Sequence, residues 1–266
     1  MKRLLLSLAM VLALAAPSFA AEDIVVGVTP FPHKDIMLAA KPLLAKEGYN
    51  LVIKEFTDYV QPNMALASKQ LFANFFQHEP YLDNMNKEKK LDLVSIGKVH
   101  IEPLGVYSKK IKKLADLKKG NSISVPNDPT NEARALRLLE ANGVITIKPG
   151  ALVTVADITK NPLGLKFHEL DAAQLPRTLD DVTASVINTN FAGEAGLVPA
   201  RDALVMEGSE SPYANIVVVR SEDKDSPKAK ALMKAVQSPE VRERIVVSVN
   251  ANGEVRELTL RIRLRF

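Results

Sequence analysis

The stretch Asn74-Phe75-Phe76-Gln77-His78-Glu79-Pro80-Tyr81-Leu82 is typical of a β-strand that leads directly into an α-helix. Side chains alternate faces along a strand, so Phe76 and His78 point the same way. Pro80 suits the first turn of a helix, which brings Tyr81 back beside them. The protein is only 5% aromatic and has no Trp, so three rings and an imidazole in one place predict a slot for a small apolar side chain. The alternative is a strand end that only feeds the core.

Strands and helices alternate on both sides of this junction. The continuous apolar run Ile24-Val25-Val26-Gly27-Val28 is typical of a strand covered on both faces. A helix is expected at 34–47, with a kink at Pro42 and Gly48 as its C-terminal cap. Further strands are expected at 51–56, 71–76, 93–96, 99–107, 122–125, 165–170, 183–187 and 214–220, and further helices at 62–68, 80–90, 132–141 and 227–236. This order indicates an α/β protein with largely parallel sheets.

The N-terminus has the three parts of a secretory signal. Met1-Lys2-Arg3 is basic, residues 4–16 are apolar, and Pro17-Ser18-Phe19-Ala20 ends in small residues, so cleavage is expected after Ala20. The apolar run is too short to span a bilayer, which takes about 20 residues. The chain has no Cys, which excludes disulfides, thiolate metal sites and a lipid on a Cys. We therefore expect an exported, unanchored protein in a periplasm.

The basic composition does not indicate a nucleic-acid-binding protein. Loss of Lys2 and Arg3 with the signal lowers the formal charge from +4 to +2, and residues 242–266 alone carry +3 from six Arg and three Glu. The rest of the mature chain is therefore −1. A basic tail on a nearly neutral body is not a surface that follows phosphates.

A second group of polar residues follows a predicted strand. Pro126-Asn127-Asp128-Pro129-Thr130-Asn131 separates a strand from a helix, with Thr130 or Asn131 as its expected N-cap and Arg134 in its first turn. A cation there opposes the helix dipole, so an anion such as a ligand carboxylate would explain it. The alternative is that Arg134 and Arg137 form a solvated face.

Two asparagines also end up beside predicted strands. Asn188 follows Val186-Ile187 at a carboxyl end, where open α/β sheets place their ligands, and Asn215 comes just before the run 216–219. An amide offers donors and an acceptor, so the pair can hold an ammonium and help to orient a carboxylate. As turn residues they would need no ligand.

An exported hydrolase is the competing class. The sequence has no Gly-x-Ser-x-Gly elbow and no Cys. Its four histidines (His33, His78, His100 and His168) lack the i, i+4 spacing of helical zinc motifs. No catalysis and no cofactor are therefore expected. A carrier of metal ions stays open as an alternative, although Arg134 in its site would repel a cation.

The motifs together resemble the NlpA/MetQ family, methionine-binding proteins that feed ABC importers. The resemblance rests on segments 58–63, 75–82, 126–131, 174–177, 186–189 and 211–215, in order between about Ile24 and Arg244. It implies a two-lobed, type II-like periplasmic binding protein with the ligand in the cleft between its lobes. It also implies an inner-membrane permease with its cytoplasmic ATPase as partner. The protein itself is expected to be a monomer. By the family's motif, Tyr59, Phe76, His78 and Tyr81 would line the side-chain pocket, Arg134 would pair with the ligand carboxylate, and Asn188 and Asn215 would hold the polar end.

The expected division of the chain gives 1–20 to the signal, 21–104 and 218–266 to lobe 1, and 105–217 to lobe 2. Strands 99–107 and 214–220 would cross between the lobes as a hinge. The chain departs from the family in having no lipid-modified Cys and in Phe72, where an acidic residue is usual. It also departs at 245–266, where a hairpin-like turn at 250–253 precedes an amphipathic strand. A divergent or frame-shifted end and a dedicated interaction strand both remain open for this tail.

Overall fold

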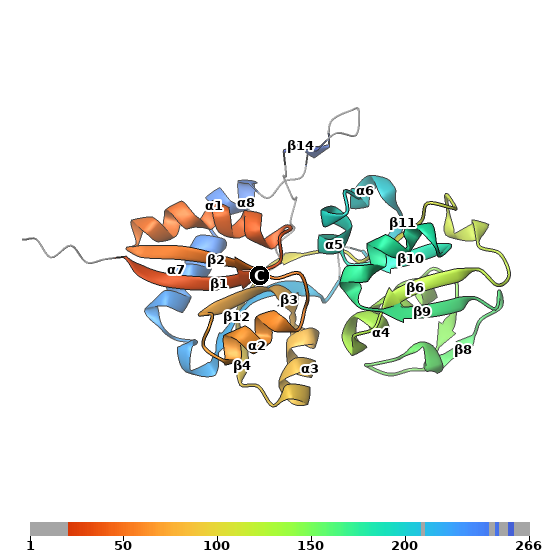
Figure 1. The fold of residues 1–266 in the computed structure, drawn as a ribbon, viewed down its shortest axis with the longest axis horizontal. Coiled ribbons are helices and arrows are strands. Elements are labelled where there is room, and N and C mark those ends of the chain that lie inside the picture. Colours follow the sequence, from red (N-terminus) through yellow and green to blue (C-terminus); the bar gives the residue numbers. More distant parts are fainter. Residues whose placement is uncertain (1–20, 209–210, 245–247, 250–254, 258–266) are drawn as a thin grey trace, which may run out of the picture.

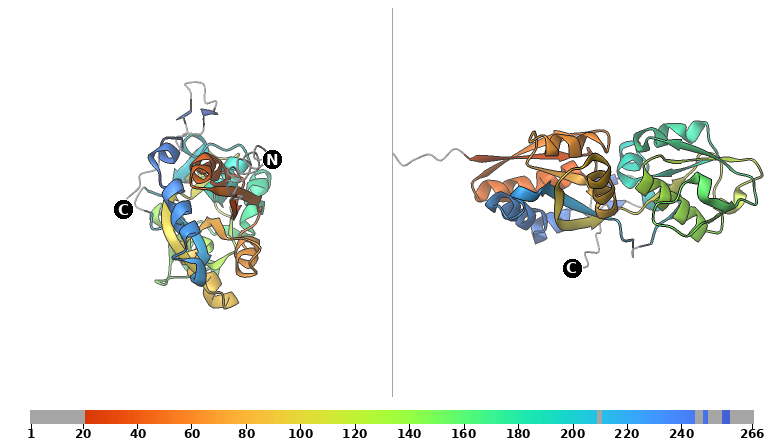
Figure 2. Two further views of the ribbon diagram at one scale, coloured as in Figure 1. Left: turned by 90° about the vertical axis from the view of Figure 1, so that its left-hand side faces the viewer. Right: turned by 90° about the horizontal axis from the view of Figure 1, so that it is seen from below.

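The computed structural model describes residues 21–208, 211–244, 248–249 and 255–257. Two lobes lie side by side along the long axis of the molecule, each built around a five-stranded sheet (Figure 1). Figure 2 shows the same separation from below. Within the described part of the chain, no helix is long and apolar enough to cross a membrane.

The first lobe has a sheet that is covered on both faces. Its strand order is β2 (Tyr49–Glu55), β1 (Glu22–Val28), β3 (Ala73–His78), β12 (Ala214–Arg220) and β4 (Leu93–Ile101). Val217 and Val219 of β12 belong to one core with α1 (His33–Lys46), α7 (Pro227–Val236) and α8 (Pro239–Arg244). Ile216 and Val218 belong to the opposite core with α2 (Gln61–Ala67) and α3 (Glu79–Lys89). The apolar runs are thus strands with two buried faces, as the sequence predicts.

The second lobe repeats this plan. Its strand order is β11 (Ala203–Met206), β5 (Gly105–Tyr107), β10 (Ala184–Ile187), β6 (Ser122–Pro126) and β9 (Lys166–Leu170). The helix α4 (Pro129–Ala141) packs on one face of the sheet, whereas α5 (Thr189–Glu194) and the 3₁₀ segment η3 (Ala172–Asp180) pack on the other. The remaining short elements are η1 (Leu114–Asp116), β7 (Thr146–Ile147), η2 (Val155–Asp157), β8 (Ile158–Lys160), α6 (Pro199–Asp202) and η4 (Ser221–Asp223).

Both sheets are mixed, which corrects the expectation of largely parallel sheets. In the first sheet β12 runs antiparallel to β3 and β4, and in the second β5 runs antiparallel to β10 and β11. The remaining pairs of these two sheets are parallel. The chain leaves one lobe and later returns to it, so strands that begin or end at a crossing have no βαβ connection to set a parallel direction.

The two crossings lie beside each other. The outward crossing joins β4, which ends at Ile101, to β5, which begins at Gly105, so the expected continuous strand 99–107 is interrupted at 102–104. The return crossing joins the end of β11 at Met206 to β12, and the whole of β12 lies in the first sheet. The division at 104/105 and 217/218 stays a prediction.

Most expected elements are present, with ends shifted by a few residues. Helix α7 has the expected bounds, and α1 contains Pro42 and ends just before Gly48, whose φ is +85°. In the tail, β13 (Ser248–Val249) pairs antiparallel with β14 (Val255–Glu257). The expected turn at 250–253 and the amphipathic strand at 258–266 lie outside the described residues.

Candidate functional site

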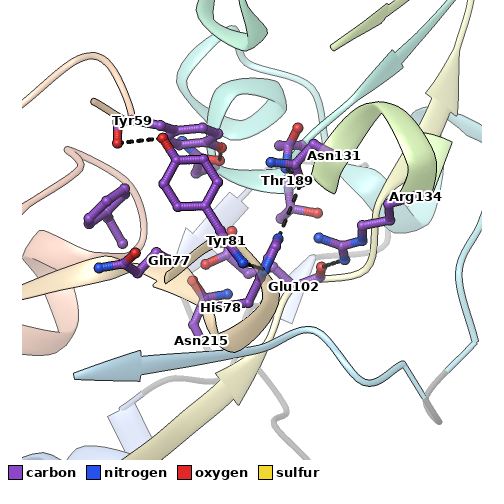
Figure 3. A pocket seen from close by; sticks show the side chains of 12 residues that line it. Tyr59, Gln77, His78, Tyr81, Glu102, Asn131, Arg134, Thr189 and Asn215 are labelled. Atoms are coloured by element: carbon purple, nitrogen blue, oxygen red, sulfur yellow. Dashed lines mark hydrogen bonds between the residues drawn. The ribbon is translucent and has the colours of Figure 1, made fainter. Parts of the chain in front are cut away.

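A cavity lies between the two lobes, and both lobes line it (Figure 3). Its empty volume, counting space open to solvent, is about 350 Å³. Its lining residues are Tyr59, Phe76, Gln77, His78, Tyr81, Glu102, Asn131, Arg134, Asn188, Thr189, Asn190 and Asn215. All seven residues predicted from the sequence are among them. Their contact with a ligand stays a prediction.

Aromatic rings form one wall of the cavity. The ring centroid of Tyr59 lies 5.9 Å from those of Phe76 and Tyr81, which are 6.0 Å from each other. The Tyr81 hydroxyl donates to the Tyr59 carbonyl over 2.8 Å, and the Tyr59 hydroxyl donates to Asn190 Oδ1 over 2.6 Å. The ring of Tyr59 also lies 5.0 Å from Phe191 of the second lobe. Because both phenols have partners in the protein, this wall presents mainly ring carbon to the cavity.

His78 is held as a neutral ring at the end of β3. It is the N-cap of α3, where its Nδ1 accepts a hydrogen bond from the Tyr81 amide over 3.2 Å. The proton is therefore on Nε2, which donates to Asn131 Oδ1 over 3.3 Å. Burial, helped by the nearby charge of Arg134, lowers the pKa of His78 to about 3. His78 contributes a hydrogen-bond donor and no charge at neutral pH.

The start of α4 differs from the expectation. The N-cap is Asp128, whose carboxylate accepts from the Asn131 amide over 3.0 Å, and Pro129 is the first helical residue. The residue before a proline is kept out of the helical region, which suits it to the cap. Neither Thr130 nor Asn131 is the cap, and Arg134 lies in the second turn of the helix. The helix-dipole reason for an anion was therefore wrong.

Arg134 nevertheless has an anion partner, and this partner is part of the protein. Its Nε donates to Glu207 Oε1 over 2.7 Å, and its Nη2 donates to Glu207 Oε2 and to the Glu102 carbonyl. The guanidinium carbon lies 4.3 Å from the ring centroid of Tyr213. Among the described residues, Nη1 has no hydrogen-bond partner, whereas Nε and Nη2 are both bonded. Arg137 is half-buried, donates to the Ala151 carbonyl over 2.9 Å and does not line the cavity.

The two asparagines present opposite groups to the cavity. The Asn188 amide nitrogen donates to Asn131 Oδ1 over 3.0 Å, and the buried Asn188 Oδ1 has no hydrogen-bond partner among the residues that the structure describes. Asn215 Oδ1 lies 3.1 Å from His33 Nε2, which leaves the Asn215 nitrogen as the available group. Asn188 therefore offers an acceptor and Asn215 a donor, although the sequence treats them alike.

The sequence did not predict the acidic residue of the cavity. Glu102 lies in the outward crossing, and its side chain is 7% exposed. Its Oε1 lies 2.6 Å from His100 Nε2 and 3.1 Å from His33 Nε2. These two histidines are 67 positions apart in the sequence, and only the pairing of β12 and β4 beside α1 brings their rings to 5.1 Å. The one local signal for this cluster was the sequence His100-Ile101-Glu102-Pro103, which spans the end of β4.

The same three residues form a group that could hold a metal ion. One donor atom from each of His33, His100 and Glu102 lies within 4.8 Å of the others. Both Nε2 atoms are at hydrogen-bond distance from a single carboxylate oxygen, a geometry in which a proton stands on each nitrogen. A cation would require both protons to leave.

The sequence also did not single out Gln77, Asn131 and Thr189 as lining residues. Asn131 and Thr189 are parts of motifs used for the resemblance, and Gln77 lies within the opening stretch, where it donates to Asn63 Oδ1 over 2.7 Å. Thr189 donates to the Pro103 carbonyl over 2.5 Å. Glu207, the partner of Arg134, had no sequence signal, because its role depends on a crossing that the fold creates.

Two α/β lobes, joined by adjacent crossings and lining one cavity, define a two-lobed substrate-binding protein of the periplasmic type, as the sequence predicts. The sequence model of the NlpA lipoprotein family matches residues 24–257. The chain therefore belongs to the NlpA lipoprotein family.

Characterised relatives and solved structures agree with this assignment. Outer membrane lipoprotein 3 of Mannheimia haemolytica is 48% identical over 86% of this chain and 89% of its own length. The D-methionine-binding lipoprotein MetQ of Escherichia coli K12 is 45% identical over 77% of this chain and 78% of its own. A nutrient-binding protein from Burkholderia cenocepacia, solved bound to methionine, is 52% identical with a TM-score of 0.82, over 84% of this chain and 95% of its own.

Proposed function

We propose that this protein is the substrate-binding protein of an ABC importer and that it captures methionine, with L-methionine as the preferred form. The observation that carries the proposal is the polarity of the cavity. Rings of Tyr59, Phe76 and Tyr81 form one wall, and Arg134, Asn188 and Asn215 supply polar groups elsewhere in the lining. An amino acid with an apolar side chain has the same two ends.

In the proposed arrangement, the ligand carboxylate lies against Nη1 of Arg134 and the amide nitrogen of Asn215. Both are donors without a partner in the described part of the chain. Asn188 Oδ1, a buried acceptor without a partner, faces the ligand ammonium. The thioether lies against the ring wall, where sulfur–aromatic contacts contribute roughly 0.3–1.5 kcal/mol. That range is too small to exclude leucine without help from the shape of the cavity.

The relatives support the class of ligand. The Burkholderia protein was solved with methionine, and the MetQ relatives are named for D-methionine. The structure of a Coxiella burnetii protein, 49% identical with a TM-score of 0.80, is described as an ABC transporter periplasmic substrate-binding protein. From these we infer delivery to an inner-membrane permease with a cytoplasmic ATPase. Other apolar amino acids and methionine-containing dipeptides are the alternative ligands.

We place the mature protein in the periplasm, after cleavage at Ala20, without a lipid anchor. Several relatives are named lipoproteins, whereas the sequence given has no Cys to carry a lipid. Fractionation of cells that express the full chain tests this placement. A membrane-bound pool that only detergent releases would contradict it.

Mass spectrometry of the ligand released from denatured, freshly purified protein tests the function. We expect methionine. The stripped and refolded protein should then bind L-methionine more tightly than D-methionine or leucine in calorimetric titrations. Release of a different compound together with no heat of methionine binding would reject the proposal.

A further inference from the structure

The carboxylate of Glu102 lines the cavity, and no lysine or arginine among the described residues forms an ion pair with it. Its side-chain ion-pair partners are His33 and His100. Arg134 donates to the Glu102 backbone carbonyl, and Glu207 occupies the guanidinium fork. The cavity therefore has a cation, Arg134, that is already paired with a carboxylate, and a carboxylate, Glu102, that has no Lys or Arg partner among the described residues.

His33, which contacts the lining residues Asn215 and Glu102, is neutral. His33 Nε2 faces two oxygens, Asn215 Oδ1 and Glu102 Oε1, so this nitrogen carries the proton. Nδ1 is then an acceptor, 2.6 Å from the Thr29 hydroxyl. Burial is the main reason that the pKa of His33 falls to about 4. His33 is therefore a donor without charge at neutral pH.

The second histidine, His100, makes the hydrogen bond to Glu102. His100 Nε2 lies 2.6 Å from Glu102 Oε1 and donates to it, whereas the buried His100 Nδ1 has no hydrogen-bond partner among the described residues. His100 thus donates to Glu102 Oε1, whereas His33 Nε2 lies 3.1 Å from the same oxygen and is hydrogen-bonded to Asn215 Oδ1.

Glu102 stays ionised beside His33 and His100. Burial by itself raises the pKa of this carboxyl, but His33, His100 and the charge of Arg134 outweigh the burial and hold the pKa below its usual value. With Oε1 taken, Oε2 accepts no hydrogen bond from a described residue. A buried carboxylate with one unpaired oxygen at a cavity requires a cationic partner.

We propose that Glu102 binds the ammonium of the ligand, with His33 and His100 as its positioning residues, and that it restricts the ligands to compounds with a free α-amino group. Asn188 supports this independently, because its Oδ1 is a second buried acceptor in the same lining. The inference rests on the proposed function and adds the class of head group.

The two ends of the ligand should then differ in importance. Without a ligand carboxylate, Arg134 keeps its partner Glu207. Without a ligand ammonium, Glu102 keeps only its contacts with His33 and His100. N-acetyl-L-methionine, which lacks the ammonium, should therefore lose more affinity than L-methioninamide, which lacks the carboxylate.

Titration calorimetry of the stripped protein at pH 7.5 with L-methionine, L-methioninamide and N-acetyl-L-methionine tests this order. We expect N-acetyl-L-methionine to bind at least about a hundredfold more weakly than L-methionine and more weakly than the amide. Equal binding of N-acetyl-L-methionine and L-methionine would overturn the inference and leave the proposed function intact. If none of the three compounds binds, the proposed function has failed and the inference fails with it.

Substitution of Glu102 tests whether this residue binds the ammonium. Glu102→Gln keeps the shape and removes the charge, so it should weaken L-methionine and the amide by about a hundredfold and leave N-acetyl-L-methionine nearly unchanged. The matched control is Glu132→Gln, a buried glutamate outside the cavity that accepts from the Val155 amide over 2.8 Å. Equal losses for all three compounds in Glu102→Gln, at an unchanged melting temperature, would contradict the role of Glu102.

The pH profile tests the positioning residues. His100→Leu removes one donor from Glu102, which raises the pKa of Glu102, so methionine affinity should fall as the pH decreases from 7.5 to 5. His100→Gln, which keeps an N–H donor, should restore much of the flatter wild-type profile. The ionisable groups around Glu102, besides His100 itself, are His33, His78, Tyr59, Arg134 and Glu194, and they are the same in both variants. Parallel profiles for the leucine and glutamine variants would reject the positioning role.

A metal ion is the remaining explanation for the cluster. Elemental analysis of the purified protein and titration with Zn²⁺ distinguish a metal site from an ammonium site. Stoichiometric zinc that a chelator removes together with methionine affinity would overturn the ammonium site, and metal-free protein with full affinity supports it.

Discussion

At the residue scale, Arg134 has two partners to satisfy. It already holds Glu207 in a buried ion pair, and it offers one nitrogen to the proposed ligand. Arg134→Ala would leave Glu207 unpaired and the ligand carboxylate without its cation. Loss of one partner of a buried pair costs about 3–5 kcal/mol, so we expect methionine to bind at least about a hundredfold more weakly.

Arg137→Ala is the matched control on the same helix, because Arg137 binds backbone carbonyls outside the cavity. It should change affinity little. Calorimetric titration of both variants with methionine decides the point, and equal small effects would assign Arg134 to a structural role.

Selectivity and affinity should depend on different residues of the cavity. Phe76→Ala removes a ring from the apolar wall and should reduce the preference for methionine over leucine. Asn188→Ala or Asn215→Ala should weaken both ligands together, by about 1–3 kcal/mol for an unpaired buried group. Titrations of both amino acids against the three variants measure this. A change of preference in an asparagine variant, with the preference intact in Phe76→Ala, would reverse the orientation of the ligand.

At the element scale, α4 delivers two residues to the cavity from one capped start. Asp128→Ala removes the acceptor for the Asn131 amide, and loss of such a cap costs about 0.5–2 kcal/mol. Asn131 and Arg134 follow on the same helix, so methionine affinity should fall as well. Asp128→Asn, which keeps a capping oxygen, is the control. Urea unfolding and calorimetry measure both effects, and an unchanged free energy of unfolding in the alanine variant would contradict the capping role.

The elements themselves could be predicted, because their signals are local. The apolar run at β1, the proline at the start of α7 and the glycine after α1 are each visible in a few residues. The break between β4 and β5 was missed, although Pro103, which a central strand rarely accommodates, lies within residues 99–107. The break arises where the chain leaves one sheet for the other.

The site also combines contacts that the local sequence predicts with contacts that depend on the topology. Phe76, His78 and Tyr81 share one strand–helix junction, so their proximity follows from strand alternation and one helical turn. The pairing of Arg134 with Glu207 spans 73 positions, and Glu102 acquires its role only when α1 packs beside β4. Such contacts depend on the topology, and single-sequence reasoning has no access to them.

At the scale of the whole molecule, acid should destabilise the protein through His33. Its pKa is about 4 in the folded state, against an ordinary 6.5, so the unfolded chain binds more protons between these values. Stability from this group is therefore present above pH 6.5 and decreases as the pH falls toward 4, by about 3 kcal/mol in all. Glu132 and Glu194, whose pKa values rise to about 7, act in the opposite direction over part of this range.

Comparison of the wild type with His33→Gln isolates the contribution of His33 to stability, because Glu132 and Glu194 are present in both proteins. Urea unfolding of the wild type and of His33→Gln at pH 7 and pH 4.5 should show a smaller loss on acidification in the variant. An equal loss in the two proteins would mean that His33 does not titrate in this range.

The lobes are joined across the cavity by direct contacts, from Tyr59 to Asn190 and from His78 to Asn131. A ligand has to enter before these contacts form, so binding and closure should be coupled. Ligand that binds only the folded protein stabilises it by about 2.7 kcal/mol at a hundredfold excess over Kd. We therefore expect saturating methionine to raise the melting temperature of stripped protein and to reduce its radius of gyration in X-ray scattering. Tyr59→Phe, which removes one contact between the lobes, should reduce the compaction and keep most of the ring wall. A melting temperature that saturating methionine does not move would mean that the cavity does not close on this ligand.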